Sequence, residues 1–207
     1  MPGAAGIYVP SCGGAFRQAE ILSGVSQIIR DITSTSTEAI PLNIVNHPYS
    51  IILSQDCDLD LDFRARNGLE GPNNKMVGRE KIIPNILLCQ VFTAKELYEN
   101  GKTSKEINST LWDRIKTNSD VRYHFCQAAE AELDATGLGL PELAIDFKRY
   151  FAIPVDDLYM QLQHSLDPKS GLVQRRLRLK SPYCEHFCTR FSFYLSRVAL
   201  PDPHLSE

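Results

Sequence analysis

Four aspartates recur at every second position just after an apolar segment of the chain. Tyr49–Leu53 is rich in β-branched and aliphatic residues and follows a turn-forming Asn and Pro, so a buried strand is expected there. If the chain remained extended beyond this strand, four carboxylates would share one face, those of Asp56, Asp58, Asp60 and Asp62. Four anions on one face repel one another. A cation, a hydrogen-bond donor or water would have to relieve that repulsion.

Asp56 and Asp58 lie nearest the expected end of the strand, which makes them the candidate catalytic and metal-binding pair. Carboxylate oxygens are the ligands that hard divalent cations prefer, so the cofactor this pair would take is Mg²⁺ or another divalent cation; no other cofactor is indicated. An EF-hand loop is excluded because its sixth and twelfth positions would be Leu61 and Asn67 instead of glycine and glutamate. The alternative is a solvated strand end that runs into an irregular loop at 64–78, whose arginines neutralise some of the acids.

Six cysteines are spread along the chain, at positions 12, 57, 89, 126, 184 and 188. The chain is too large to need disulfides and shows no secretion signal, so reduced thiols are expected. Cys57 lies between two aspartates, which disfavour the thiolate and predict a buried structural role. Cys184 and Cys188 would share one face of a helix, and zinc would need a second pair of ligands at similar spacing. Packing in the core is therefore expected for this pair.

Length and composition are those of an ordinary globular protein. The 207 residues are 43% hydrophobic and 23% charged, enough for a single domain over 1–207 with its own core. The net charge of −3 argues against a surface that coats nucleic acid, although local basic patches are compatible with it. No apolar run approaches the ~20 residues needed to span a bilayer, and the first residues lack the features of a signal peptide. A cytoplasmic protein that does not enter a membrane is expected.

The apolar pattern predicts a mixture of strands and helices. The segment 15–30 is compatible with a helix or a strand, and extended segments are expected at 40–45, 82–93, 143–153 and 173–180. Helices are expected after Thr93, where Glu96 completes a capping box, and then from 104, at 156–163 and from 181 to about 198. The predicted fold class is α+β, with a small, strongly bent β-sheet or barrel, a helical insertion at about 94–135 and a C-terminal helix.

The strand expected at 173–180 carries a row of basic side chains. Alternation would turn its aliphatic side chains inward and leave Arg176, Arg178 and Lys180 on the outer face. The neighbouring Arg175 would join this basic row. Such a face could bind an anionic partner, namely RNA, DNA or an acidic protein surface. The alternative is a face that is merely solvated, since no aromatic side chains for base stacking are interleaved with it.

Four segments and a closing helix follow one another in an order that resembles the MazF and PemK family of SH3-like barrels. They read RQAEIL, HPYSIILS, ILLCQVFT and IDFKRYFAIP. The resemblance implies an SH3-like barrel and an endoribonuclease that cleaves RNA through attack by the 2′-hydroxyl. The family's Gly-Asp-Ile becomes Ala-Glu-Ile at 19–21, its Arg-Pro becomes His47 and Pro48, and its strand-end threonine is matched by Thr93. The segments SQDCDL and SPY…RF…RV.LP also look like an uncharacterised bacterial family.

Two functions from different classes follow from these residues. The first is an interaction or regulatory module that works beside a larger protein partner, in a bacterial defence or toxin-like system, and leaves the chemistry to that partner. The second is a nucleic-acid hydrolase, metal-free with His47 as acid or base beside Thr93, or metal-dependent through Asp56 and Asp58. A single histidine before a proline, such as His47, could equally be an ordinary surface or capping residue, and the family's arginine is absent here. Convergence of these four side chains in one cleft would favour the enzyme. The oligomeric state stays open.

Overall fold

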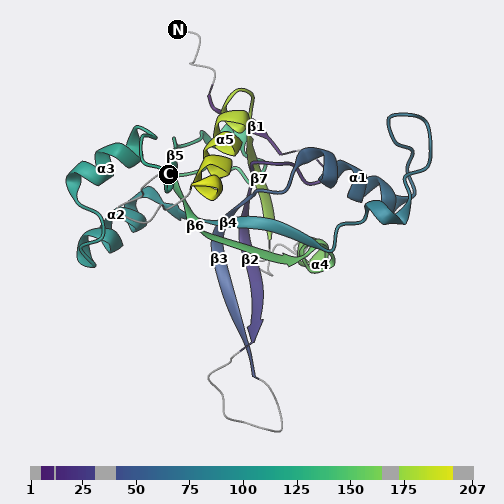
Figure 1. Cartoon of the computed structure of the whole chain (residues 1–207), viewed down its shortest axis with the longest axis horizontal. Coiled ribbons are helices and arrows are strands. Elements are labelled where there is room, and N and C mark those ends of the chain that lie inside the picture. Colours follow the sequence, from purple (N-terminus) through teal and green to yellow (C-terminus); the bar gives the residue numbers. More distant parts are fainter. Residues whose placement is uncertain (1–5, 12, 31–40, 165–172, 198–207) are drawn as a thin grey trace, which may run out of the picture.

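The fold is a seven-stranded antiparallel sheet with five α-helices around it (Figure 1). The computed structural model of the chain describes residues 6–11, 13–30, 41–164 and 173–197. The strands are β1 (Tyr8–Pro10), β2 (Glu20–Arg30), β3 (Leu42–Ile52), β4 (Asn85–Thr93), β5 (Tyr123–Cys126), β6 (Leu143–Pro154) and β7 (Gln174–Leu179). The helices are α1 (Asp56–Asn67), α2 (Ala94–Thr103), α3 (Ser109–Lys116), α4 (Val155–His164) and α5 (Tyr183–Ser196). These elements confirm the α+β class.

The order of the strands leaves the sheet open. Across the described residues it runs β1-β7-β2-β3-β4-β6-β5, and every paired strand is antiparallel to its neighbour. β1 and β5 lie at opposite edges instead of pairing with each other. The expected SH3-like barrel is therefore not confirmed.

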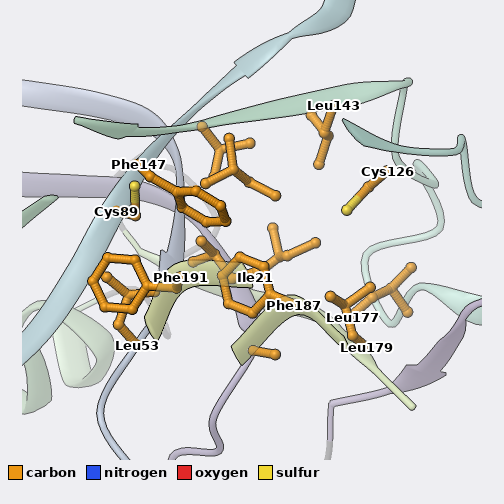
Figure 2. Close-up of a cluster of buried hydrophobic side chains, with 14 of the residues drawn as sticks. Ile21, Leu53, Cys89, Cys126, Leu143, Phe147, Leu177, Leu179, Phe187 and Phe191 are labelled. Carbon is orange, nitrogen blue, oxygen red and sulfur yellow. The ribbon is translucent and has the colours of Figure 1, made fainter. Parts of the chain in front are cut away.

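Neighbouring residues of the central strands point to opposite faces of the sheet and build two apolar clusters. On one face, Ile21 belongs to a cluster that also contains Phe187 of α5 (Figure 2). On the other face, the next residue, Leu22, belongs to a cluster that includes Leu59 of α1 and Leu158 of α4. Full burial of a side chain such as Phe187 stabilises the fold by about 1.5–3 kcal/mol. The period of two in the strands thus fixes which helix covers which face.

β2 and β3 form a long hairpin whose outer half projects from the rest of the molecule (Figure 1). Among the described strands, β2 pairs with β7 between Glu20 and Ser23, and β3 pairs with β4 over Tyr49–Ile52. Further out, residues 24–30 and 42–48, here called the arm, pair with each other alone. Gly24 marks the start of the arm with a φ of 77°, which glycine tolerates best, and it lies opposite a proline that has no N–H for the ladder.

Residues 56–67 form a helix, so the expected extended run of aspartates is wrong. Each helical residue is turned by about 100° from the one before it, and positions two apart therefore lie on nearly opposite sides. Asp56 and Asp60 share one side of α1, whereas Asp58 and Asp62 share another. The four carboxylates consequently do not form a single anionic face.

The order of charges along α1 explains why a helix forms there. Asp56 and Asp58 lie in its first turn, and Arg64 and Arg66 lie in its last turn. Each sign of charge is at the end where the helix dipole favours it. Each arginine also pairs with the aspartate four positions before it. Gly68 then ends the helix in the left-handed conformation, with a φ of 60°.

The segment 94–135 contains the expected helices and also a strand. Thr93 begins α2 with the expected capping box, which Glu96 completes, and this prediction is confirmed. α3 begins at Ser109, later than the expected start at Ser104. β5 follows and pairs with β6 as an edge strand, so the insertion is not purely helical. In the part of the chain that the structure describes, no helix is long and apolar enough to cross a membrane.

Candidate functional site

A cavity of about 400 Å³, here called the α5 cavity, lies where the start of α1, the start of β4 and helix α5 meet. Asp58 of α1 and Cys188 of α5 both line it. Asp56, His47 and Thr93 are not among the residues that line it. The fold therefore brings one of the four predicted catalytic residues to this concave surface and leaves the other three elsewhere.

Asp56 has a structural role at the start of α1. Its Oδ1 accepts a hydrogen bond from the backbone N–H of Gln18 at 2.7 Å, and its Oδ2 lies 4.0 Å from Nη1 of Arg178. These contacts join α1 to the chain before β2 and to β7. Within the described ranges, no group of three or more His, Cys, Asp or Glu side chains could hold a metal ion. A divalent cation at Asp56 and Asp58 therefore stays a prediction.

Arginines neutralise the later aspartates of α1, as the alternative interpretation expected. Asp60 accepts a hydrogen bond at 2.6 Å from Nε of Arg64. Asp62 is only 1% exposed and accepts hydrogen bonds from Arg66 at 2.8 Å and from the backbone N–H of Ile83 at 3.0 Å. Burial of a carboxylate removes it from water and costs free energy, so a buried carboxylate needs hydrogen-bond donors around it. Asp62 thus holds the chain before β4 against α1.

His47 is buried in the arm close to where it leaves the sheet. Its ring stacks on Phe151 of β6 with the ring centroids 4.1 Å apart, and its Nε2 lies 3.3 Å from Oε1 of Gln27. Nδ1 is buried and has no hydrogen-bond partner in the part of the chain that is described. Burial lowers the pKa of His47, so the imidazole is neutral at physiological pH. Among the residues that the structure describes, no carboxylate makes a hydrogen bond to the ring, and the proposed acid or base role stays a prediction.

Thr93 uses its side chain to begin α2. Its Oγ1 accepts a hydrogen bond from the backbone N–H of Glu96 at 3.2 Å and donates to the Glu96 carboxylate at 2.8 Å. The same carboxylate accepts a hydrogen bond from the backbone N–H of Thr93. The reciprocal contacts account for a threonine at this position without any part in catalysis.

The arginines of β7 are mostly engaged inside the protein. Arg176, expected on the outer face, is 4% exposed and donates to Asp134 at 3.0 Å through Nε, so that expectation is wrong. Arg175 pairs at 2.5 Å with Glu20, which is fully buried. The two remaining members of the predicted anion-binding row are half-buried, and Arg178 lies near Asp56. β7 therefore does not present a row of free cations.

The residues that the sequence did not identify lie on the arm. Four large aliphatic side chains there are exposed to solvent, by 56% for Ile28, 38% for Ile29, 64% for Leu42 and 67% for Ile44. Ile28 and Ile44 are directly paired across the two strands. The signal was the long apolar stretch in 15–30 together with the extended segment after it, but nothing local indicated that the two would pair away from the sheet.

Searches of family models, of curated proteins and of solved structures found no match to this chain. The resemblance to the MazF and PemK family consequently stays a prediction.

Proposed function

We propose that this chain is a noncatalytic interaction module that binds a larger protein partner through the β2–β3 arm. The observation that carries the proposal is the group of four exposed aliphatic side chains on a hairpin that projects from the sheet. Soluble proteins rarely leave contiguous apolar surface exposed unless another molecule covers it.

The geometry of the arm fits insertion into a partner. Ile28 and Ile44 face each other across the ribbon, and Leu42 lies two positions from Ile44 and therefore on the same face. Ile29 projects from the opposite face. A two-stranded ribbon is at best marginally stable in water, so burial of these side chains by a partner would stabilise the arm itself. At the base of the arm, Gln161 of α4 makes hydrogen bonds with the backbone N–H and carbonyl oxygen of Ser26, which ties the start of the arm to the rest of the fold.

The charge of the arm favours a protein over a nucleic acid. Its residues, 24–30 and 42–48, include one formally charged side chain, Arg30. Nucleic-acid binding depends on several cations that neutralise phosphates. The net charge of −3 and the internal pairing of Arg175 and Arg176 support the same choice.

The alternative endoribonuclease has less support from the described residues. Thr93 and Asp56 have contacts that fit structural roles, and His47 is buried against an aromatic ring. Only Asp58 faces the α5 cavity. The proposal therefore assigns Thr93, Asp56 and His47 to the fold.

The test compares two double variants of the arm. Ile28→Thr with Ile44→Thr keeps β-branched side chains but removes apolar surface, whereas Ile28→Val with Ile44→Val keeps the surface apolar. Tagged chains would be used to capture partners from native extract, and the affinity for the captured protein would then be measured with purified components. The Thr variant is expected to lose about 2–3 kcal/mol, or on the order of 100-fold in Kd, and the Val variant less than about tenfold.

Two results would contradict this function. One is a partner that binds the Thr variant as tightly as the unchanged chain while both show the same melting temperature. The other is cleavage of mixed RNA by the purified chain that His47→Ala abolishes without unfolding it, because this outcome would establish the hydrolase instead.

A further inference from the structure

Helix α5 presents two cysteine thiols beside the α5 cavity. Cys184 and Cys188 are one helical turn apart and therefore lie on the same face of α5. Both are half-buried, and Cys188 lines the cavity. The two thiols are within hydrogen-bonding reach of each other, with Cys188 as the donor. A small ion that enters the cavity would meet the sulfur of Cys188, and the Cys184 thiol lies one turn earlier on the same face, where it donates to the carbonyl oxygen of Gln18.

The spacing of the two residues decides what can join them. Residues i and i+4 of a helix have Cβ atoms about 5–6 Å apart, whereas a disulfide needs about 3.5–4.5 Å. A direct sulfur–sulfur bond would therefore distort α5, but an atom inserted between the sulfurs would not. Zinc would need four ligands, and no cluster of three or more His, Cys, Asp or Glu side chains suited to a metal occurs in the described residues. The pair fits a soft ion that is satisfied by two thiolates.

We propose that Cys184 and Cys188 form a two-coordinate binding site for a soft monovalent cation of the cuprous type. Thiolates select Cu(I) over the hard cations that carboxylates prefer. Binding releases one proton from each thiol, so Cu⁺ and two thiols give an anionic bis-thiolate complex and two protons. No change of oxidation state is involved. This inference concerns α5 and does not depend on the function of the arm.

The electrostatics around the pair are consistent with this site. The hydrogen bond from Cys188 lowers the pKa of the Cys184 thiol, and the charge of Arg178 acts in the same direction, against burial and the nearby acids Glu185 and Asp56. The same hydrogen bond and burial raise the pKa of Cys188. The cation must therefore displace the proton of each thiol when it binds. Arg178 would then neutralise the complex.

The experiment is an anaerobic competition for Cu(I) against a chromogenic chelator, with the full-length chain. One cuprous ion per chain is expected. Cys184→Ser and Cys188→Ser are each expected to abolish that binding. Cys57→Ser is the matched control because Cys57 is an exposed thiol on α1, so the buried position predicted for it is wrong. Arg178→Gln should weaken binding by about tenfold, as loss of an outer-shell partner does, and Arg178→Lys should restore most of it. Equal melting temperatures would show that the variants are folded.

Several results would overturn the site. They are the absence of Cu(I) binding, loss of binding in Cys57→Ser or Cys12→Ser alone, and full retention in Cys188→Ser. A further one would come from Co²⁺, used as a spectroscopic substitute for Zn²⁺. If Co²⁺ bound through these cysteines with a tetrahedral absorption spectrum, the site would have four ligands instead of two.

Discussion

Arg176 offers the sharpest test of whether β7 holds the fold or binds an anionic partner. Its guanidinium is 4% exposed and lies against Asp134, with Nε at 3.0 Å from Oδ2. Nη2 also donates to the carbonyl oxygen of Gly139 at 2.6 Å. Arg178 lies two residues along the same strand. Its side chain is 33% exposed, and its Nη1 lies 4.0 Å from the carboxylate of Asp56. The two arginines form a matched pair that differs mainly in burial and contact distance.

We expect Arg176→Met to lower the free energy of unfolding by about 3–5 kcal/mol, because Asp134 would be left as a buried charge without its main partner. Thr136 still donates to Asp134 at 2.6 Å, which favours the lower end of that range. Arg178→Met should cost no more than about 1 kcal/mol, as exposed ion pairs do. With a urea m-value of about 2 kcal/mol/M, the unfolding midpoint would fall by about 1.5–2.5 M for Arg176→Met and by at most about 0.5 M for Arg178→Met.

The double variant Arg176→Met with Asp134→Leu supplies the control for the pair itself. It removes both charges, so most of the loss should be recovered. The dependence of stability on pH in the acid range gives a second readout. Burial alone would raise the pKa of Asp134, but hydrogen bonds from Arg176 and Thr136 outweigh it and lower the pKa. This stabilisation is therefore present above the ordinary pKa of an aspartate and is lost as the pH falls through the lowered value.

Equal urea midpoints for Arg176→Met and Arg178→Met would refute this reasoning. So would a fully stable Arg176→Met chain that has lost affinity for RNA, since that result would return Arg176 to the anion-binding row expected from the sequence.

Two further predictions concern Thr93, which caps α2, and His124, a buried residue of β5. Thr93→Ala should lower the free energy of unfolding by about 1 kcal/mol through loss of the α2 cap, and Thr93→Ser should retain most of it; thermal melting would measure both, and an unchanged Thr93→Ala chain would contradict the structural role. Burial, with Arg190 and His186 nearby, lowers the pKa of His124 to about 3, so below about pH 6.5 the unfolded chain binds a proton that the folded chain does not. His124 should therefore lower the free energy of unfolding by about 1.4 kcal/mol for each pH unit below 6.5, or about 2 kcal/mol at pH 5. An equally steep dependence of the melting temperature on pH in His124→Phe would count against this prediction.

The sequence predicted elements that depend on nearby residues. The capping box at Thr93 and the strand at 143–153 are examples, because the relevant partners lie within a few positions or follow a period of two. The aspartates of α1 alternate with the period of a strand, and this pattern predicts an extended run in place of the helix. The i,i+4 pairs and the Gly68 that ends the helix would have identified it.

The candidate site was less predictable because it depends on contacts between distant segments. Arg175 and Arg176 look like an exposed basic row until Glu20 and Asp134 are brought beside them from positions far away in the chain. The arm poses the same difficulty. Whether Ile28 and Ile44 face a core or solvent depends on where β7 and β4 stop pairing with the hairpin, which no local pattern encodes.

Buried ion pairs connect these observations. Four buried carboxylates each pair with an arginine from another part of the fold or from the next helical turn: Glu20 with Arg175, Asp62 with Arg66, Asp134 with Arg176 and Asp146 with Arg122. Such pairs add little net stability, but an arrangement that separates them leaves a buried charge without its partner. We expect the three pairs that join distant segments to favour the observed arrangement of strands and loops. The arginines in these four pairs are not free to bind phosphates. The arm, by contrast, exposes aliphatic side chains, and this difference supports the proposal of a protein partner over a nucleic acid.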